Sequence, residues 1–117
     1  MSVLTSEELL AQLAAVGHAQ RLRIVGELAQ GRVHVSELAR RLGLSRPLLY
    51  MHLERLEKAG LVEGALELSE DGKAMKFFEL TPFDIHVTLD TVLAALREDK
   101  LQAAHAEREA GKKGTHT

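Results

Sequence analysis

The sequence contains no cysteine and no tryptophan, and aromatic residues make up only 3% of it. Without cysteine the chain cannot form a disulfide, a zinc finger, an iron–sulfur cluster or a thiol nucleophile. So few aromatic side chains argue against a stacking platform for single-stranded nucleic acid. The six histidines and the carboxylates are the only side chains left that suit a metal ion.

Long apolar runs are also missing from the sequence. No stretch approaches the roughly 18 residues that are needed to cross a bilayer. Residues 1–13 lack the basic start and the small-residue cleavage site of a signal peptide. We therefore expect a cytoplasmic protein with no membrane partner.

What is present is enough for one small folded domain. The 117 residues are 45% hydrophobic and 27% charged, a composition that can bury a core. From about residue 103 the sequence turns to Ala, Glu, Lys and Gly. We expect one domain over residues 1–110 and a disordered tail over residues 111–117.

The charges are unevenly distributed along the chain. The formal net charge is -2, yet residues 20–58 hold eight Arg and Lys against four Glu. A basic middle flanked by acidic ends suits a molecule that presents one face to a polyanion. Ordinary surface patchiness would produce the same pattern, so charge alone does not decide between the two.

Two helices are expected at the start of the chain. Thr5 and Glu8 have the spacing of a capping box, and the helix that follows should end near Gly17. A second apolar stripe of helical spacing covers residues 19–30. Gly31 then supplies the left-handed position that ends many helices.

Two further helices follow at close spacing. Ser36 is the expected N-cap of a short helix over residues 37–42, which Gly43 ends. Ser45 then caps a fourth helix, in which Pro47 fits the first turn because the amides there have no partner within the helix. Two short helices joined by so tight a turn are the pattern of a helix-turn-helix.

After Gly60 the hydrophobic pattern changes. Residues 61–68 and 74–80 are two short apolar or alternating segments joined by an Asp-Gly turn, which predicts a β-hairpin. The expected fold is therefore mainly α, or α+β: a winged helix-turn-helix with the order helix, helix, helix, helix, strand, strand, helix. The last helix is expected to begin with Thr81 as N-cap and Pro82 as its first residue.

The apolar stripe of the last helix has no evident partner within so small a fold. A subunit interface, shared with the first helix, explains it most simply. The expected dimer-interface residues are Leu9, Leu10, Leu13, Ile85, Leu89, Val92, Leu93 and Leu96.

The fourth helix suits the major groove of double-stranded DNA, which admits one α-helix. With Leu49, Leu53 and Leu56 facing inward at 100° per residue, the opposite face is free for contact. Arg46 is the best candidate for a guanine edge or a phosphate. The expected DNA-contact residues are Arg40, Arg41, Ser45, Arg46, Pro47, Tyr50, Met51, Lys58, Lys73 and Lys76.

Three stretches carry a family resemblance: AQRLRIV at residues 19–25, VSELARRLGLS at residues 35–45 and HLERLEKAGLV at residues 52–62. Together they resemble the ArsR/SmtB family of winged-helix regulators, over roughly residues 13–82. The resemblance implies a homodimer or related dimer, assembled through the first and last helices, that binds an inverted-repeat operator and often senses a metal. The chain is also similar to the nickel-responsive branch that governs superoxide dismutase genes in actinobacteria.

The first metal site of that family is not matched here. Its thiolate-sensing members carry a Cys-x-Cys-Asp run, and the matching positions in this sequence are His34, Ser36 and Glu37. Soft metals and arsenic need thiolates, so we exclude them as signals.

A second kind of metal site is half matched. In members that sense through the last helix, an Asp-x-His pair corresponds to Asp84 and His86, but Arg97 and Lys100 stand where the remaining ligands are expected. His86 and Asp90 are four residues apart and would share one helical face, where a second subunit could complete a site for nickel or zinc. The alternative is a surface or interface histidine paired with Asp90.

No catalytic arrangement can be extracted from so short a chain, so we expect no enzyme activity. We predict a DNA-binding transcriptional regulator that acts as a dimer. Three alternatives stay open: a winged-helix module that binds only protein, a regulator without a metal response, and a DNA-binding subunit that needs a separate metal-sensor partner.

Overall fold

The computed structural model describes residues 3–114, with side chains for residues 3–111. The chain divides into two compact units, one of residues 11–84 and one formed by the chain up to Leu10 together with the chain from Ile85. Among the described residues there are five helices and one three-stranded antiparallel sheet. The predicted mainly helical winged helix-turn-helix is therefore confirmed.

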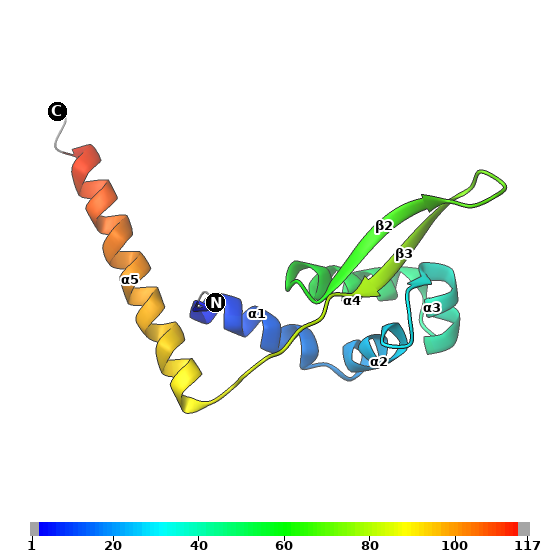
Figure 1. The fold of residues 1–117 in the computed structure, drawn as a ribbon, viewed down its shortest axis with the longest axis horizontal. Coiled ribbons are helices and arrows are strands. Elements are labelled where there is room, and N and C mark those ends of the chain that lie inside the picture. The colour runs from blue at the N-terminus through cyan, green and yellow to red at the C-terminus, as the bar shows by residue number, and fades with distance from the viewer. Residues whose placement is uncertain (1–2, 115–117) are drawn as a thin grey trace. The chain divides into compact units, whose positions relative to one another are not determined.

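The elements follow the predicted order with one short strand added (Figure 1). They are α1 (Ser6–Val16), α2 (Ala19–Leu28), β1 (Val33–His34), α3 (Val35–Leu42), α4 (Arg46–Lys58), β2 (Val62–Leu68), β3 (Ala74–Leu80) and α5 (Leu89–Gly114). No described helix is both long enough and apolar enough to cross a membrane.

The first two helices begin at side-chain caps. At the start of α1 the Thr5 amide donates to Glu8 Oε1 at 3.0 Å, and the Glu8 amide donates to Thr5 Oγ1 at 3.2 Å. This reciprocal pair is the predicted capping box. At the start of α2 the Gln20 amide donates to His18 Nδ1 at 3.1 Å, so His18 is the N-cap of that helix.

The cap of α3 differs from the prediction. Ser36 is not the N-cap: the helix already begins at Val35, and His34 Nδ1 accepts from the Glu37 amide at 3.4 Å. His34 can take this role because it ends β1 with extended backbone directly before the helix. Gly43 ends α3 in the left-handed conformation, with φ 66°, and lets the chain turn into α4.

α4 begins as predicted. Ser45 Oγ accepts from the Leu48 amide at 3.3 Å, and Pro47 lies in the first turn of the helix. The missing amide of Pro47 removes no helical hydrogen bond at this position. The tight turn and the cap together fix where α4 starts relative to α3.

The core of residues 11–84 lies where α2, α3 and α4 pack on one another and on β2 and β3. The three leucines predicted to face inward from α4 are all buried. The largest fully buried side chains are Ile24, Leu38, Leu49, Leu53, Leu56, Leu61 and Val62. Each such side chain contributes roughly 1.5–3 kcal/mol to folding when it leaves water.

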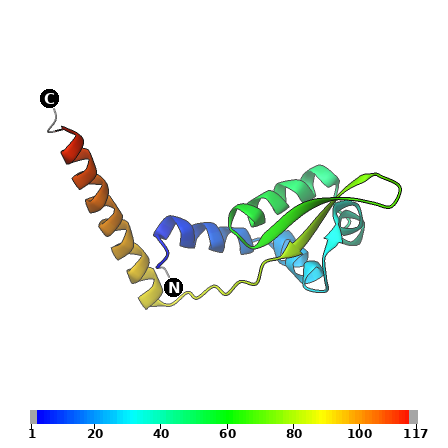
Figure 2. The same ribbon diagram turned by 45° about the horizontal axis from the view of Figure 1, so that its top comes forward.

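The predicted hairpin is part of a sheet with strand order β1-β3-β2. β2 and β3 pair over seven residues each, and Gly72 in their turn has φ 81°. Figure 2 shows β1 beside β3, and the register places Val33 opposite Phe78. A strand of two residues is too short to show alternation in the sequence, so the hydrophobic pattern could not predict it.

α5 begins at Leu89, so the prediction of a helix from residues 81–82 was wrong. The Thr81 amide instead donates to the Leu61 carbonyl at 3.0 Å, which keeps this part of the chain extended beside the sheet. The helix starts at a second reciprocal cap, in which the Thr88 amide donates to Thr91 Oγ1 at 2.8 Å and the Thr91 amide donates to Thr88 Oγ1 at 3.1 Å. This pair fixes the start of α5 seven residues beyond Pro82.

α5 continues to Gly114. Residues 111–114, the first part of the predicted tail, form the end of this helix, and residues 115–117 lie outside the described residues.

The unit made of the two chain ends is held together by α1 and α5. The Ser6 amide donates to Asp99 Oδ1 at 2.9 Å, and the Ser6 hydroxyl donates to Asp99 Oδ2. These two hydrogen bonds lower the pKa of Asp99, because they stabilise its charged form. Leu9 and Ala95 are buried in this unit, at 7% and 2% exposed.

Candidate nucleic-acid interface

One face of α4 is free of contacts with the core, as the sequence predicted. Tyr50 and Met51 are 43% and 48% exposed, and Pro47 is exposed on the same side. Glu54, one turn further along, is exposed as well. A helix whose opposite face is fully buried and whose outer face carries these side chains is oriented for contact with a large partner.

Arg46, in the first turn of α4, is tied to the preceding helix. Its Nη2 donates to the hydroxyl of Ser36 in the first turn of α3. The guanidinium is exposed, but the hydrogen bond directs it toward α3 instead of leaving it free on α4. Spacing along one helix could not reveal this bond, since the partner lies ten residues away across the turn.

Arg40 and Arg41 share a carboxylate. Arg40 Nε donates to Glu37 Oε2 at 2.9 Å, and Arg41 Nε donates to Glu37 Oε1 at 3.1 Å. These hydrogen bonds lower the pKa of Glu37 to about 2. Any contact of the two arginines with an external anion therefore competes with a carboxylate that is charged at all ordinary pH values.

Lys58, at the end of α4, is paired in the same way. Its Nζ lies 3.1 Å from Glu54 Oε1, one turn earlier on the exposed face. Both side chains of this pair are exposed, so water and salt screen the interaction between them. Glu54 thus neutralises one of the predicted DNA contacts.

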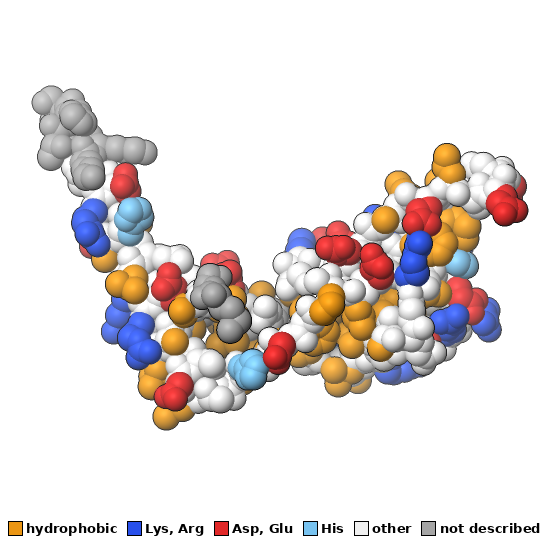
Figure 3. Space-filling view, in the orientation of Figure 1, with side chains coloured by type: hydrophobic (Ala, Val, Ile, Leu, Met, Phe, Trp, Pro, Cys, Tyr) orange, Lys and Arg blue, Asp and Glu red, His pale blue; other side chains and the backbone are white. Residues whose placement is uncertain are grey.

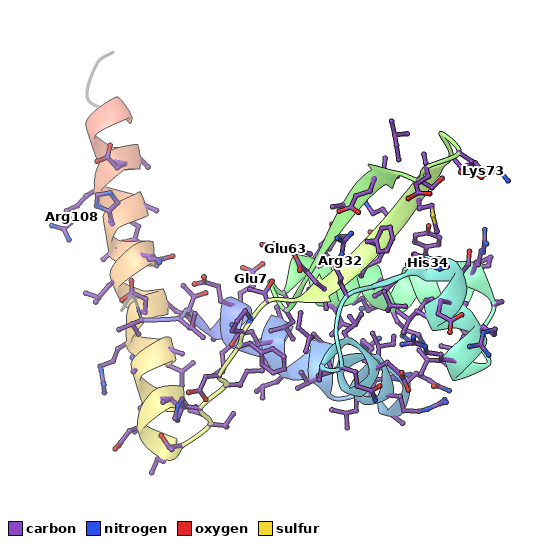
Figure 4. The ribbon with its side chains drawn as sticks, turned by 45° about the vertical axis from the view of Figure 1, so that its right-hand side comes forward. Glu7, Arg32, His34, Glu63, Lys73 and Arg108 are labelled. Carbon is purple, nitrogen blue, oxygen red and sulfur yellow. The ribbon has the colours of Figure 1, made fainter. Side chains whose placement is uncertain are left out.

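The end of the wing is acidic, and Figure 3 shows the acidic side chains at its tip. There the Ser69 hydroxyl donates to Asp71 Oδ1, and this bond lowers the pKa of Asp71. Lys73 is labelled at the same tip in Figure 4. The charge of Asp71 opposes an approach of this tip to phosphate, so Lys73 is the weakest of the predicted cationic contacts.

A cleft of about 270 Å³ opens between α3, α4 and the wing. Its polar lining comes from His34 and Ser36 on one side, Arg46 and Tyr50 of α4, and Lys76 of β3. Of the predicted DNA-contact residues, the cleft brings together Arg46 and Tyr50 of α4 and Lys76 of β3. The others lie outside its lining: Arg40, Arg41, Ser45, Pro47, Met51, Lys58 and Lys73.

Arg21 and His52 are a buried pair that the sequence analysis did not single out for a joint role. Arg21 Nε and Nη2 donate to the carbonyls of Ala15 and Ala14 at 2.7 and 3.1 Å, and its Nη1 lies 3.1 Å from His52 Nδ1. One side chain of α2 thereby links the end of α1 to α4. The available signal was position, because Arg21 falls on the buried stripe of α2.

The His52 ring is 3% exposed. Its pKa is lowered, first by burial and then by the nearby His18, Arg21 and Arg55. The neutral ring has one acceptor nitrogen, and the Arg21 guanidinium can only donate, so Nδ1 accepts from Arg21. The arrangement favours an uncharged His52.

The premise of the predicted metal site is wrong in one respect. His86 lies in the non-helical residues 81–88, and Asp90 lies in the first turn of α5, so the two do not share a helical face. Among the described residues, no three or more His, Cys, Asp or Glu side chains gather closely enough to hold a metal ion. Asp84 lies in the same non-helical segment.

The predicted dimer-interface residues differ in exposure. Leu10, Leu89, Leu93 and Leu96 are 63%, 74%, 42% and 47% exposed. The half-buried members are Leu13, Ile85 and Val92, and the buried one is Leu9. The exposed members leave apolar surface on α1 and α5 that nothing in the described residues covers.

Comparisons with known proteins agree with this architecture. The model of the arsR family of bacterial regulatory proteins matches residues 18–64. The chain is 36% identical over 73 residues to an uncharacterized HTH-type transcriptional regulator of Methanocaldococcus jannaschii, covering 62% of this chain and 76% of that relative.

Solved structures of bacterial regulators have a similar fold. HlyU of Vibrio cholerae has a TM-score of 0.56 and 26% identity, over 80% of this chain and 91% of that one. The transcriptional repressor BigR of Xylella fastidiosa has a TM-score of 0.55 and 25% identity, over 85% and 87%. A homodimeric winged helix-turn-helix DNA-binding domain of Mycobacterium bovis has a TM-score of 0.57 and 24% identity, over 87% and 84%.

The fold, the exposed face of α4 and the matched family model agree with one another. These regulators are not enzymes, which is consistent with the sequence analysis. The chain belongs to the ArsR family and is a DNA-binding transcriptional regulator of the winged helix-turn-helix type.

Proposed function

We propose that the protein binds an inverted-repeat operator as a symmetric homodimer, with α4 of each subunit in the major groove. The observation that carries this proposal is the division of α4 into a fully buried face and a face that exposes Pro47, Tyr50 and Met51. Two such helices about 34 Å apart would enter successive major grooves on one side of the duplex. Whether binding represses or activates depends on where the operator lies in the promoter.

The homodimer rests on the apolar surface of the terminal unit. Leu89, Leu93 and Leu96 stand at i, i+4 and i+7 on α5, and all three are exposed. Contiguous apolar surface of this kind on a small chain marks an interface. The Mycobacterium bovis domain of the same fold is itself homodimeric, which supports the same arrangement here.

A response to nickel or zinc stays a prediction, as does the similarity to the nickel-responsive branch. Asp84, His86 and Asp90 lie close in sequence, but only Asp90 belongs to a helix. A complete ligand set would need further nitrogen or oxygen ligands from a second subunit. Equilibrium dialysis of the wild type and of His86→Ala against Ni²⁺ and Zn²⁺ tests the prediction, and equal metal uptake by both would contradict it.

The DNA-binding proposal is tested by selecting duplexes from a random pool with the purified chain. The selected duplex and an unrelated duplex of equal length are then titrated by fluorescence anisotropy at two salt concentrations. We expect preference for the selected duplex, loss of affinity at the higher salt because bound counterions are released, and two chains per duplex by light scattering.

A regulator of this kind acts where the chromosome is, so we propose a cytoplasmic location.

Each other outcome selects an alternative. Absence of salt-dependent binding to any duplex would overturn the proposal and favour a winged-helix module that binds only protein. One chain per duplex would overturn the homodimer. Binding that appears only after a separately encoded metal-binding subunit is added would point to the heteromeric regulator.

A further inference from the structure

We propose that the cleft between α3, α4 and β3 holds one backbone phosphate of the DNA, with Arg46 and Lys76 as its two cations and Ser36 as a positioning residue. The inference rests on the proposed function and deepens it. It assigns Arg46 to the DNA backbone, where the sequence left a choice between a phosphate and a guanine edge.

The charged side chains that line the cleft are cationic. Its lining contains Arg46, Lys76 and His34 and no carboxylate. Within the part of the chain that the structure describes, neither Arg46 nor Lys76 has a carboxylate within ion-pair distance. Two cations from different elements line one small space, and none of the described carboxylates pairs with either of them, which favours an external anion.

The other cationic candidates near α4 are already neutralised. Arg40 and Arg41 share Glu37, and Lys58 is paired with Glu54. A phosphate would have to displace a carboxylate from each of these side chains. The cleft is the one described place where predicted DNA-contact cations converge and are still available.

The opposite face of the sheet carries mainly acidic side chains. A second cleft there is lined by Arg32 together with Glu63, Glu67 and Glu79. Arg32 Nη2 lies 2.6 Å from Glu67 Oε1, and the guanidinium stacks 4.2 Å from the centre of the Phe77 ring. The charge of Arg32 is therefore already paired within the chain. Figure 4 labels Arg32 and Glu63 near the hairpin.

This acidic face of the hairpin repels phosphate, and Glu63 and Glu79 stand directly opposite each other on β2 and β3. The sheet therefore has one face that repels DNA and one that attracts it. The attracting face is the one next to α4, so the helix and the wing present their usable charge to the same cleft.

The cleft also holds several hydrogen-bond donors. The Ser36 hydroxyl accepts from Arg46 Nη2, and its own hydrogen remains free to donate to a phosphate oxygen. Lys76 Nζ lies 5.6 Å from the centre of the Phe78 ring, which holds the ammonium beside the sheet. The Tyr50 hydroxyl is a further donor in the lining.

With Arg46 held toward α3, base reading falls to the exposed side chains of α4 further along the helix, which are Tyr50, Met51 and Glu54. Loss of Arg46 should then weaken every duplex alike. Loss of a base contact would instead weaken only the preferred one.

The test uses the wild type, Arg46→Ala, Lys76→Gln and the double variant, each with the selected duplex and the unrelated duplex. Each single variant removes one phosphate contact from each of the two subunits. We expect the affinity for both duplexes to fall by roughly tenfold per subunit, the effect of a lost hydrogen bond to a charged group, and so by roughly hundredfold for the dimer. The magnitude of the slope of log affinity against log salt should fall by about two, which is about one for each half-site. Arg108→Gln, on α5, removes the same charge and serves as the matched control that changes neither quantity.

A second experiment locates the phosphate. Single phosphates of the selected duplex are replaced one at a time by neutral methylphosphonates. We expect one position in each half-site to weaken binding of the wild type and to have no further effect on the double variant. In the Ser36→Ala variant, the methylphosphonate at that position should weaken binding less than it does in the wild type. The circular dichroism spectrum should stay unchanged, since Ser36 is not the cap of α3.

Three results would overturn the assignment. Arg46→Ala could relax the preference at one base pair and leave the unrelated duplex unaffected, which would make Arg46 a base-reading residue. The double variant could stay sensitive to every methylphosphonate, which would remove the phosphate from the cleft. If the wild type binds neither duplex, the proposed function itself is wrong and the phosphate site is rejected with it.

Discussion

The two units of the chain differ in how their apolar side chains are covered. In residues 11–84 the side chains of α2, α3, α4 and the sheet enclose one another, and seven large side chains are less than 2% exposed. In the terminal unit, Asp99 of α5 is hydrogen-bonded to Ser6 at the start of α1, and α5 leaves Leu89, Leu93 and Leu101 at 74%, 42% and 63% exposed.

The difference shows that the two units gain their stability from different sources. The winged-helix unit has a core of its own. The surface of α5 carries apolar side chains that the described residues leave exposed, and we propose that a second subunit covers them. Substitutions in the core of residues 11–84 should therefore alter the stability of the fold, and substitutions on the exposed face of α5 should alter dimer formation.

The largest expected effect is loss of the dimer. Leu89→Glu together with Leu93→Glu places two charges per subunit in the proposed interface, and burying an unpaired carboxylate is strongly unfavourable. We expect light scattering to report a monomer and the affinity for the operator to fall. The control is Leu22→Glu on α2, where the leucine is 58% exposed in the other unit, and it should remain a dimer. A full dimer in the double variant would contradict the interface.

The next effect concerns the core. Leu38→Ala removes a side chain that is 0% exposed, and it should lower the free energy of unfolding by about 2–5 kcal/mol. Leu22→Ala, at a leucine that is 58% exposed on α2, is the matched change and should stay within about 0.5 kcal/mol. Urea denaturation followed by circular dichroism measures both. Similar losses for the two variants would contradict the closed core of the winged-helix unit.

Glycine substitutions sharpen the same contrast. A Cβ on Gly64 of β2 would lie 2.8 Å from Phe78 Cε1, so Gly64→Ala forces a buried ring to move and should cost about 1–3 kcal/mol. A Cβ on Gly111 of α5 meets nothing within 4 Å, and Gly111→Ala should stabilise the helix by up to about 1 kcal/mol. The check is the thermal midpoint of each variant. A Gly64→Ala protein as stable as the wild type would show that the strand and ring adjust freely.

The smallest effect is a pH dependence confined to the winged-helix unit. The folded-state pKa of His52 lies below the ordinary value of 6.5, so the unfolded chain binds the proton first as the pH falls. The wild type should thus lose stability from about pH 7 downward through 6.5. His52→Gln keeps a neutral acceptor for Arg21 and should lose less over the same range. Parallel urea midpoints from pH 8 to 5 measure the difference, and identical declines would remove His52 as the cause.

Local interactions account for most of what was predictable in the fold. The capping box of Thr5 and Glu8, the cap by Ser45 and the left-handed Gly43 each involve residues within a few positions of one another. The exposed face of α4 also follows from spacing, because side chains at 100° intervals place the leucines on one side. The pairing of Glu37 with Arg40 and Arg41 was readable from the same i, i+3 and i, i+4 spacing.

The sequence by itself thus determined the helices, the turn between α3 and α4, the inward leucines and the family resemblance. The tertiary structure decided the rest: the pairing of β1 with β3, the burial of Arg21 against His52, the hydrogen bond from Thr81 to Leu61 that keeps the chain extended there, and the bond from Arg46 to Ser36. The physical reason is the range of the interactions. Caps and helical spacing depend on neighbours in the chain, whereas strand pairs, buried ion–dipole contacts and clefts exist only after distant segments have packed together.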